Sequence, residues 1–121
     1  MSIPVSPTEL GTIAAHYDAA ILITLPAGTY AKILTVDPEI QDDGTIGIDG
    51  ISSSTVANVA NNPRVTLVWQ PLKHHGWSLI VDGTTIIVHD DGAAPRLLVA
   101  PESGMLHRPA GHADGPAAPT A

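Results

Sequence analysis

The chain has 121 residues, 44% of them hydrophobic and 14% charged, so it has the length of one domain and enough apolar side chains for one core. The formal net charge is −7 with only five Lys and Arg, which argues against a nucleic-acid partner, because phosphate backbones are bound by clustered cations. The absence of Cys excludes disulfides, thiolate metal sites and a Cys nucleophile. No stretch approaches the ~20 apolar residues of a membrane-spanning helix, and the N-terminus has no basic, apolar leader, so we expect a cytoplasmic protein without a membrane partner.

Two short helices are expected. Ser6 and Glu9 have the spacing of a capping box, and apolar residues then recur at helical spacing to about Asp18. The four hydroxyl residues 52–55 offer N-caps for a second helix, which must stop at Asn61-Asn62-Pro63 because proline cannot continue it.

Short strands fill most of the remaining chain. Asp82-Gly83 fits either a tight hairpin turn or a bulge inside one long strand, and Asp90-Asp91-Gly92 predicts a turn. Residues 111–121 consist mainly of Ala, Gly and Pro, so we expect a domain over 1–110 and a disordered tail over 111–121. The expected strands cover residues 20–25, 29–36, 45–48, 64–69, 78–81, 84–88 and 96–99.

Three segments together carry a resemblance. Residues 53–69 place Ser at the start of a short helix, Asn-Pro at its end and an alternating strand behind it, and residues 76–84 and 105–110 follow in order. This arrangement resembles the pyridoxamine 5'-phosphate oxidase-like, FMN-binding split β-barrel superfamily. The resemblance implies a mainly β fold, a six-stranded antiparallel split barrel with two short helices. It also implies a homodimer with FMN in two interface clefts, and a single strand over 78–88.

The resemblance also assigns candidate cofactor-binding residues. It places Lys32 and Ser53 at the FMN phosphate, and it places the backbone of Ile33, Leu34 and Thr35 along the flavin ring. Asp49 and Gly50 match the end of the third strand, beside the site. Ser54 and Thr55 stand where many flavin binders carry Arg and Lys, and Trp77 is the better of the two Trp residues for stacking on a planar ligand.

Each of these assignments has a plainer alternative. The hydroxyl residues 52–55 would also serve as ordinary N-caps, and Trp77 would also serve in packing. Lys32 could simply lie on the solvent face of its strand, although a charge inside the apolar run 31–34 favours a role in the site. His74-His75 is expected to be part of an exposed loop, because adjacent histidines point apart and rarely share a metal.

The sequence leaves three functions open. The first is an FMN-dependent oxidoreductase of unknown substrate, in which the flavin carries the redox chemistry. The second is a non-catalytic binder of a flavin, of the deazaflavin F420 or of a tetrapyrrole such as haem. The third is a homodimer that keeps the fold without a cofactor. No catalytic acid or base stands out, and no metal site is expected.

Overall fold

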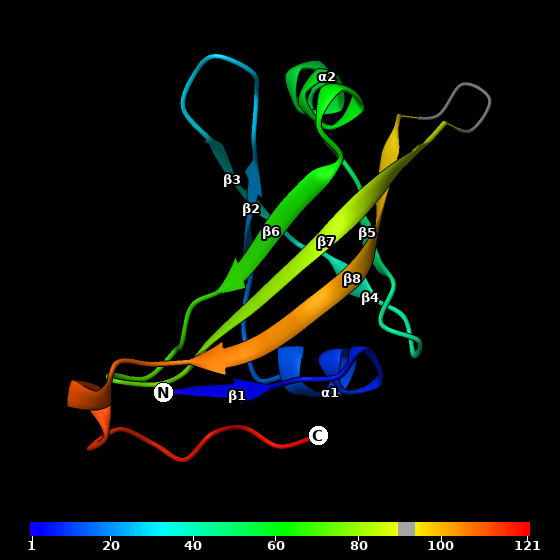
Figure 1. Cartoon of the computed structure of the whole chain (residues 1–121). Coiled ribbons are helices and arrows are strands. Elements are labelled where there is room, and N and C mark those ends of the chain that lie inside the picture. Colours follow the sequence, from blue (N-terminus) through cyan, green and yellow to red (C-terminus); the bar gives the residue numbers. More distant parts are fainter. Residues whose placement is uncertain (90–93) are drawn as a thin grey trace.

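A curled antiparallel sheet makes up most of the computed structural model, which describes residues 1–89 and 94–121 (Figure 1). The strands are ordered β3-β2-β6-β7-β8-β5-β4, and β1 pairs with β8. The mainly β, split-barrel prediction is confirmed. The strands are β1 (Ser2–Pro4), β2 (Ala20–Thr24), β3 (Lys32–Val36), β4 (Glu39–Ile40), β5 (Ile46–Ile48), β6 (Arg64–Trp69), β7 (Ser78–Val88) and β8 (Arg96–His107).

The described strands number eight rather than the six expected. The difference comes from two very short segments, β1 and β4, which extend the sheet by pairing with β8 and β5. Neither segment has the length or the alternation that identifies a strand in a sequence.

Both predicted helices form, with the predicted starts. Glu9 accepts hydrogen bonds from the backbone N–H and the hydroxyl of Ser6, at 3.0 and 2.7 Å, and these bonds lower the pKa of the Glu9 carboxyl. The segment is a 3-10 turn (Pro7–Glu9) followed by α1 (Leu10–Ala14), which ends earlier than the expected Asp18. The second helix, α2 (Ser53–Asn61), is capped by Ser52 and ends before Pro63.

Asp82-Gly83 is a bulge within β7, so the hairpin interpretation is wrong and the single strand implied by the resemblance is confirmed. The pairing between β7 and β8 shifts at this point: Asp82 lies opposite Ser103, but Gly83 lies opposite Pro101. A Cβ at Gly83 would stand 2.6 Å from the carbonyl oxygen of Ala100, so glycine permits a close approach of two strands here rather than a turn.

The last strand is longer than the expected 96–99, since β8 continues to His107. The sequence did not predict this continuation, because Pro101 cannot donate a hydrogen bond to a neighbouring strand and therefore argues against a strand at that position. It is tolerated at the irregularity opposite Gly83.

The core lies on the concave face of the sheet and contains Trp69 together with Leu, Ile and Val. Thr24 and Thr55 are buried beside it at the end that carries α2. The largest side chains with less than 2% exposure include Leu10, Leu22, Ile46, Ile48, Leu67, Leu79, Leu97 and Leu106. None of the described helices is long and apolar enough to cross a bilayer.

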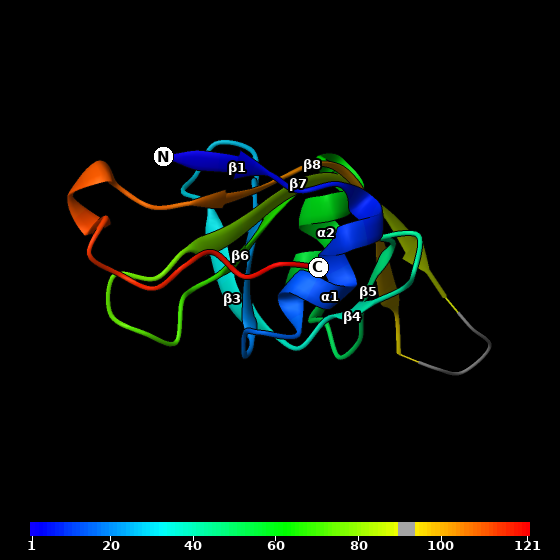
Figure 2. The same cartoon turned by 90° about the horizontal axis from the view of Figure 1, so that it is seen from below.

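The C-terminal segment contains a 3-10 turn (Ala110–His112) and then runs under β1 and α1, at the opposite end of the sheet from α2 (Figures 1 and 2). Ala118 packs against the core. These contacts favour a docked segment, and the disorder expected over 111–121 stays a prediction for a mobility measurement. The predicted turn at Asp90-Asp91-Gly92 lies outside the described residues.

Candidate functional site

Three hydroxyl side chains gather at the N-terminus of α2 and form what we call the hydroxyl cluster: Ser52, Ser54 and Thr55. The Oγ of Ser52 lies 3.1 Å from the Oγ of Ser54 and 3.0 Å from the Oγ1 of Thr55. It also accepts a hydrogen bond from the Thr55 backbone N–H at 3.3 Å, which is the N-cap bond. Ser52 and Ser54 are exposed, whereas Thr55 is buried. One hydroxyl therefore anchors the cluster while two face solvent.

Lys32 reaches this cluster from β3. Its Nζ donates to the Oγ of Ser52 at 3.3 Å and to the Oγ of Ser54. In the sheet Lys32 pairs with Thr24, whose side chain is 1% exposed, and cross-strand partners share a face. Lys32 therefore lies on the core side of β3, at its end, and not on the solvent face as the alternative held.

The arrangement suits an anion. The first-turn N–H groups of a helix have no intrahelical partner, and the helix dipole adds a partial positive charge there. Lys32 adds a full charge, and the hydroxyls add further donors. Ser53, the residue expected at the phosphate, is the first exposed residue of α2. Ser52, one of the hydroxyl residues 52–55 that could either cap the helix or help to hold a phosphate, makes a contact to Lys32.

The other basic side chains are engaged elsewhere or lie away from the cluster, and all five belong to the described part of the chain. Arg96 donates to Asp49 at 2.8 Å and to Glu39 at 3.3 Å. Arg64 follows the far end of α2. Lys32 is therefore the basic residue that contacts the hydroxyl cluster.

The remaining candidates on β3 divide between the two faces of the strand. Leu34 pairs with buried Leu22 and faces the core, whereas Ile33 and Thr35 face outward and are exposed. Among the described strands β3 is an edge of the sheet, and an edge strand leaves backbone groups without a ladder partner. This edge can therefore offer hydrogen bonds to a planar ligand.

Asp49 and Gly50 connect β5 to α2. The Asp49 carboxylate binds Arg96, so it is already neutralised by a cation. Gly50 has a φ of 69°, a left-handed conformation that favours glycine. These two residues shape the entry to the helix rather than contribute a contact to the hydroxyl cluster.

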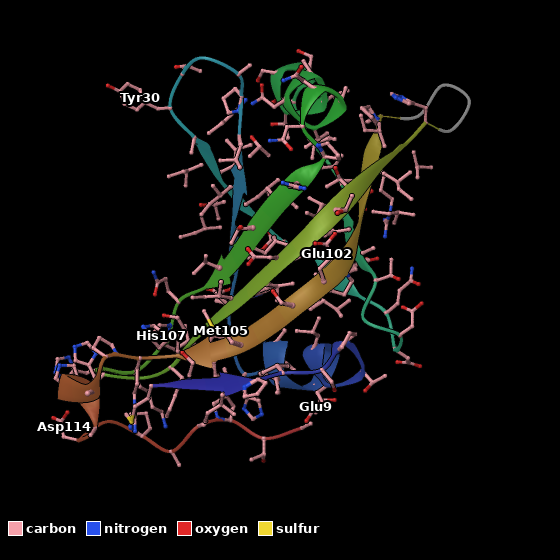
Figure 3. The ribbon with its side chains drawn as sticks, in the orientation of Figure 1. Glu9, Tyr30, Glu102, Met105, His107 and Asp114 are labelled. Carbon is pink, nitrogen blue, oxygen red and sulfur yellow. The ribbon has the colours of Figure 1, made fainter. Side chains whose placement is uncertain are left out.

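Trp77 lies at the other end of the molecule, immediately before β7. Its Nε1 donates to the carbonyl of Pro116 at 3.3 Å, and the guanidinium of Arg108 stacks 4.3 Å from its ring centroid. The structure therefore does not bring Trp77 together with Lys32. Tyr30, an aromatic residue that sequence reasoning overlooked, is 91% exposed on the loop that leads to Lys32, and Figure 3 shows it far from Asp114.

No family model matches the chain. Two curated proteins match the chain, an uncharacterized protein of Mycobacterium bovis and an uncharacterized protein of Mycobacterium tuberculosis. Each is 35% identical to it, and the match covers 93% of this chain and 84% of the relative.

Many solved structures are similar in fold, and three of them illustrate the likeness. The first is an FAD binding protein from Mycobacterium smegmatis, with a TM-score of 0.63 and 21% identity over 89% of this chain and 100% of that one. The second is a putative pyridoxamine 5'-phosphate oxidase from Listeria innocua, with a TM-score of 0.65 and 13% identity over 78% and 92%. The third is an F420 reductase, with a TM-score of 0.64 and 13% identity over 77% and 93%. The chain belongs to the same family as the two mycobacterial proteins, and its fold is that of the pyridoxamine 5'-phosphate oxidase-like split-barrel superfamily.

Proposed function

We propose that this protein is a homodimeric flavin-binding protein that holds FMN and serves as an oxidoreductase for a small-molecule substrate. The observation that carries the proposal is the contact of Lys32 with Ser52 and Ser54 at the N-terminus of α2. The similar structures include an FAD binding protein and an F420 reductase, which supports a flavin-type ligand in general. FMN is the narrower choice.

The residues at the hydroxyl cluster fit the phosphate of FMN. The Lys32 ammonium would neutralise part of its charge, and the exposed hydroxyls of Ser52 and Ser54 would donate to its oxygens, as would the first N–H groups of α2. The edge of β3 at Ile33 and Thr35 would then run along the ring. When bound, the flavin supplies the hydride or electron transfer, while the protein orients it and excludes water.

The homodimer is supported by an apolar row on the outer face of the sheet. Ile21 pairs with Val68, Val68 with Ile80, and Ile80 with Met105, so four outward side chains adjoin across β2, β6, β7 and β8. Met105 is 36% exposed, and Figure 3 shows it on β8. A contiguous apolar patch on the outside of a small domain is typical of a subunit interface.

A second candidate is a non-catalytic binder of a flavin, of F420 or of haem. The observation that favours it is that a single cation contacts the hydroxyl cluster, where many flavin binders carry two more basic residues at positions 54 and 55. A phosphate held by one Lys is bound less tightly than one held by three cations.

The visible spectrum of the purified protein, before and after adding each cofactor, separates these functions. We expect FMN to bind in a salt-sensitive manner and riboflavin, which lacks the phosphate, to bind more weakly. A reducible bound flavin that turns over with added electron donors would support the oxidoreductase. Retention of F420 or haem in preference to FMN would favour the second candidate. Binding of none of them would contradict both.

Sedimentation of the same samples tests the homodimer. We expect the wild type to sediment with twice the mass of one chain at micromolar concentration. The variant Ile80→Asp, which puts a charge in the apolar row, should sediment with the mass of a single chain. A single-chain mass in the wild type would contradict the proposed dimer.

A further inference from the structure

A cavity of about 330 Å³, which we call the α1 cavity, lies between α1, the connection from β3 to β4 and the end of β6. Figure 2 shows β4 beside α1, and a Cβ at Gly11 of α1 would stand 3.7 Å from Cγ2 of Ile40 in β4, so these two elements lie close together. The volume is at the lower end of the range for small-molecule sites. Asp37 lines the cavity and follows β3, so at the rise of a strand the cavity lies roughly 16 Å along the chain from Lys32.

One wall of the α1 cavity carries an indole N–H that has no hydrogen-bond partner. Trp69 is 2% exposed, and its Nε1 makes no hydrogen bond within the described part of the chain, whereas the indole N–H of Trp77 donates to a carbonyl at 3.3 Å. Among the described residues, Arg108 Nε is the one side-chain N or O atom that is both sealed from solvent and unpartnered. The Trp69 Nε1 is therefore open to solvent, and because Trp69 lines this cavity, its N–H is a donor that faces the cavity. A buried Trp N–H usually has a partner, so this one is available to a ligand.

Two carboxylates line the same cavity. Asp18 follows α1 and Asp37 follows β3; both are exposed, and neither forms an ion pair with another described residue. The five Lys and Arg residues all belong to the described chain, and none of them lines the cavity. In a chain with a net charge of −7, two carboxylates without a cationic partner favour a cation in the cavity and disfavour an anion.

The rest of the lining is mostly apolar and small. The Tyr17 hydroxyl donates to the Trp77 carbonyl at 2.8 Å, so this donor is already engaged. The apolar lining residues are Ala14, Ala15, Pro38 and Ile40. A ligand that fits this lining therefore has a compact carbon skeleton, a positive charge for the carboxylates and an acceptor atom for the indole N–H.

A hydroxylated amine meets all three requirements. Its ammonium group is a donor that pairs with carboxylates, and the hydrogen bonds are strengthened by the charges. Its hydroxyl oxygen accepts a hydrogen bond from an indole N–H and can also donate to a carboxylate. An amine without hydroxyls leaves the indole N–H unsatisfied, and a neutral polyol leaves the carboxylates without a cation.

We propose that the α1 cavity is a binding site for a small hydroxylated amine, with the ammonium group at Asp18 and Asp37 and a hydroxyl oxygen at the indole N–H of Trp69. Because the two carboxylates are exposed, each ion pair contributes little, and the affinity is in the millimolar range. The proposal uses no residue of the hydroxyl cluster, so it is independent of the proposed flavin site.

The test is a titration of the full-length chain with glucosamine at about pH 6, where the amine is protonated. The indole N–H resonances of Trp69 and Trp77 report the binding. Glucose is the matched probe without the charge, and cyclohexylamine is the matched probe without the hydroxyls. We expect glucosamine to shift the Trp69 resonance more than that of Trp77, and the two other probes to bind at least about fivefold more weakly.

Two variants locate the site. Asp18→Asn combined with Asp37→Asn removes both charges at nearly constant shape and should weaken glucosamine binding by about tenfold. Ala15→Leu, at an exposed position in the lining, keeps both charges but fills the cavity, and should weaken binding by a similar factor.

The matched control is Asp82→Asn combined with Glu102→Gln, which removes the same number of charges from exposed positions on β7 and β8. Glucosamine affinity in this control should stay within about twofold of the wild type, since exposed charges at a distance are largely screened by salt.

Four outcomes would overturn the proposal. The first is no binding of glucosamine up to about 100 mM, a concentration that detects even weak millimolar affinity. The second is equal binding of glucose, which would deny the carboxylates a role, and the third is equal binding of cyclohexylamine, which would deny the Trp69 donor a role. The fourth is an unchanged affinity in Ala15→Leu or in the variant that lacks both carboxylates, which would place the ligand elsewhere on the protein.

Discussion

The two ends of the sheet place their basic side chains in opposite situations. At the α2 end Lys32 is half-buried, and its contacts are two exposed serine hydroxyls. At the tail end Arg108 is buried, stacks on Trp77 and donates to the Pro116 and His75 carbonyls. The first end presents donors to solvent, whereas the second has its donors covered by the protein's own chain.

The difference shows which end is prepared for a diffusible anion. A buried donor without a partner is unfavourable by about 1–3 kcal/mol, and the Pro116 carbonyl of the tail is one of the two acceptors of the buried Arg108 guanidinium. Even there, its Nε has no hydrogen-bond partner within the described residues. Exposed hydroxyls form hydrogen bonds to water, so the hydroxyl cluster does not reduce the stability of the protein when no anion is bound.

The largest expected effect is a loss of FMN affinity at the α2 end. Lys32→Ala should weaken FMN binding by about ten- to a hundredfold, because a charge-assisted contact to phosphate contributes about 1.5–3 kcal/mol. Riboflavin, which lacks the phosphate, should be affected much less. Fluorescence titration of both ligands against both proteins measures the difference.

Arg64→Ala is the matched control for that experiment. Arg64 is exposed and follows the far end of the same helix, so its loss removes one positive charge without touching the hydroxyl cluster. FMN affinity should stay within about twofold of the wild type, since exposed charges at this distance are largely screened by salt. Equal losses for both variants, or equal losses for FMN and riboflavin, would remove Lys32 from the site.

The next largest expected effect is a loss of stability when the tail is removed. A chain that stops after Ala110 loses the Pro116 carbonyl, and with it the acceptor of Trp77 and Arg108. We expect the free energy of unfolding to fall by about 1–3 kcal/mol. In a domain of this size the thermal midpoint should fall by roughly 3–10 °C, measured by calorimetry.

Removal of only Thr120 and Ala121, both exposed, is the control and should leave the midpoint unchanged. An unchanged midpoint after removal of 111–121 would instead support the disordered tail that the composition of the segment predicts. Amide exchange over 112–119 decides the same question directly, because a docked segment is protected and a mobile one is not.

The α2 end was largely predictable from the sequence, and the tail end was not. The hydroxyl residues are contiguous, their capping chemistry is local, and Pro63 marks the end of the helix, so α2 and its N-terminus follow from neighbouring residues. The approach of Lys32 came from the resemblance, because contacts between positions 32 and 54 are not local. The position of Trp77 within one chain, away from Lys32, was not predictable for the same reason.

The tail contacts depend on residues that are distant in the chain. Pro116 meets Trp77, and Asp114 meets His75, at sequence separations of 39 residues. Composition favours disorder because the segment has no large apolar side chain, yet its backbone carbonyl and small residues fit a groove made by others. The bulge at Gly83 also depends on a distant residue. Glycine is required there because the carbonyl oxygen of Ala100 leaves no room for a Cβ.

The smallest expected effect is a weakening of tail docking at acid pH. The hydrogen bond from His75 lowers the pKa of the Asp114 carboxyl below its ordinary value. A carboxyl whose pKa is depressed in the folded state contributes stability above its unfolded pKa of about 3.9, and the contribution is lost as pH falls through the folded pKa. Tail docking should therefore weaken slightly below about pH 4, and the Trp77 indole resonance should follow it. Asp114→Asn should abolish this dependence, whereas Asp43→Asn should leave it intact, since the bonds that lower the pKa of Asp43 come from Thr45 in a separate turn. An acid shift of Trp77 that persists in Asp114→Asn would mean that another group loosens the tail, and that Asp114 does not help to hold it.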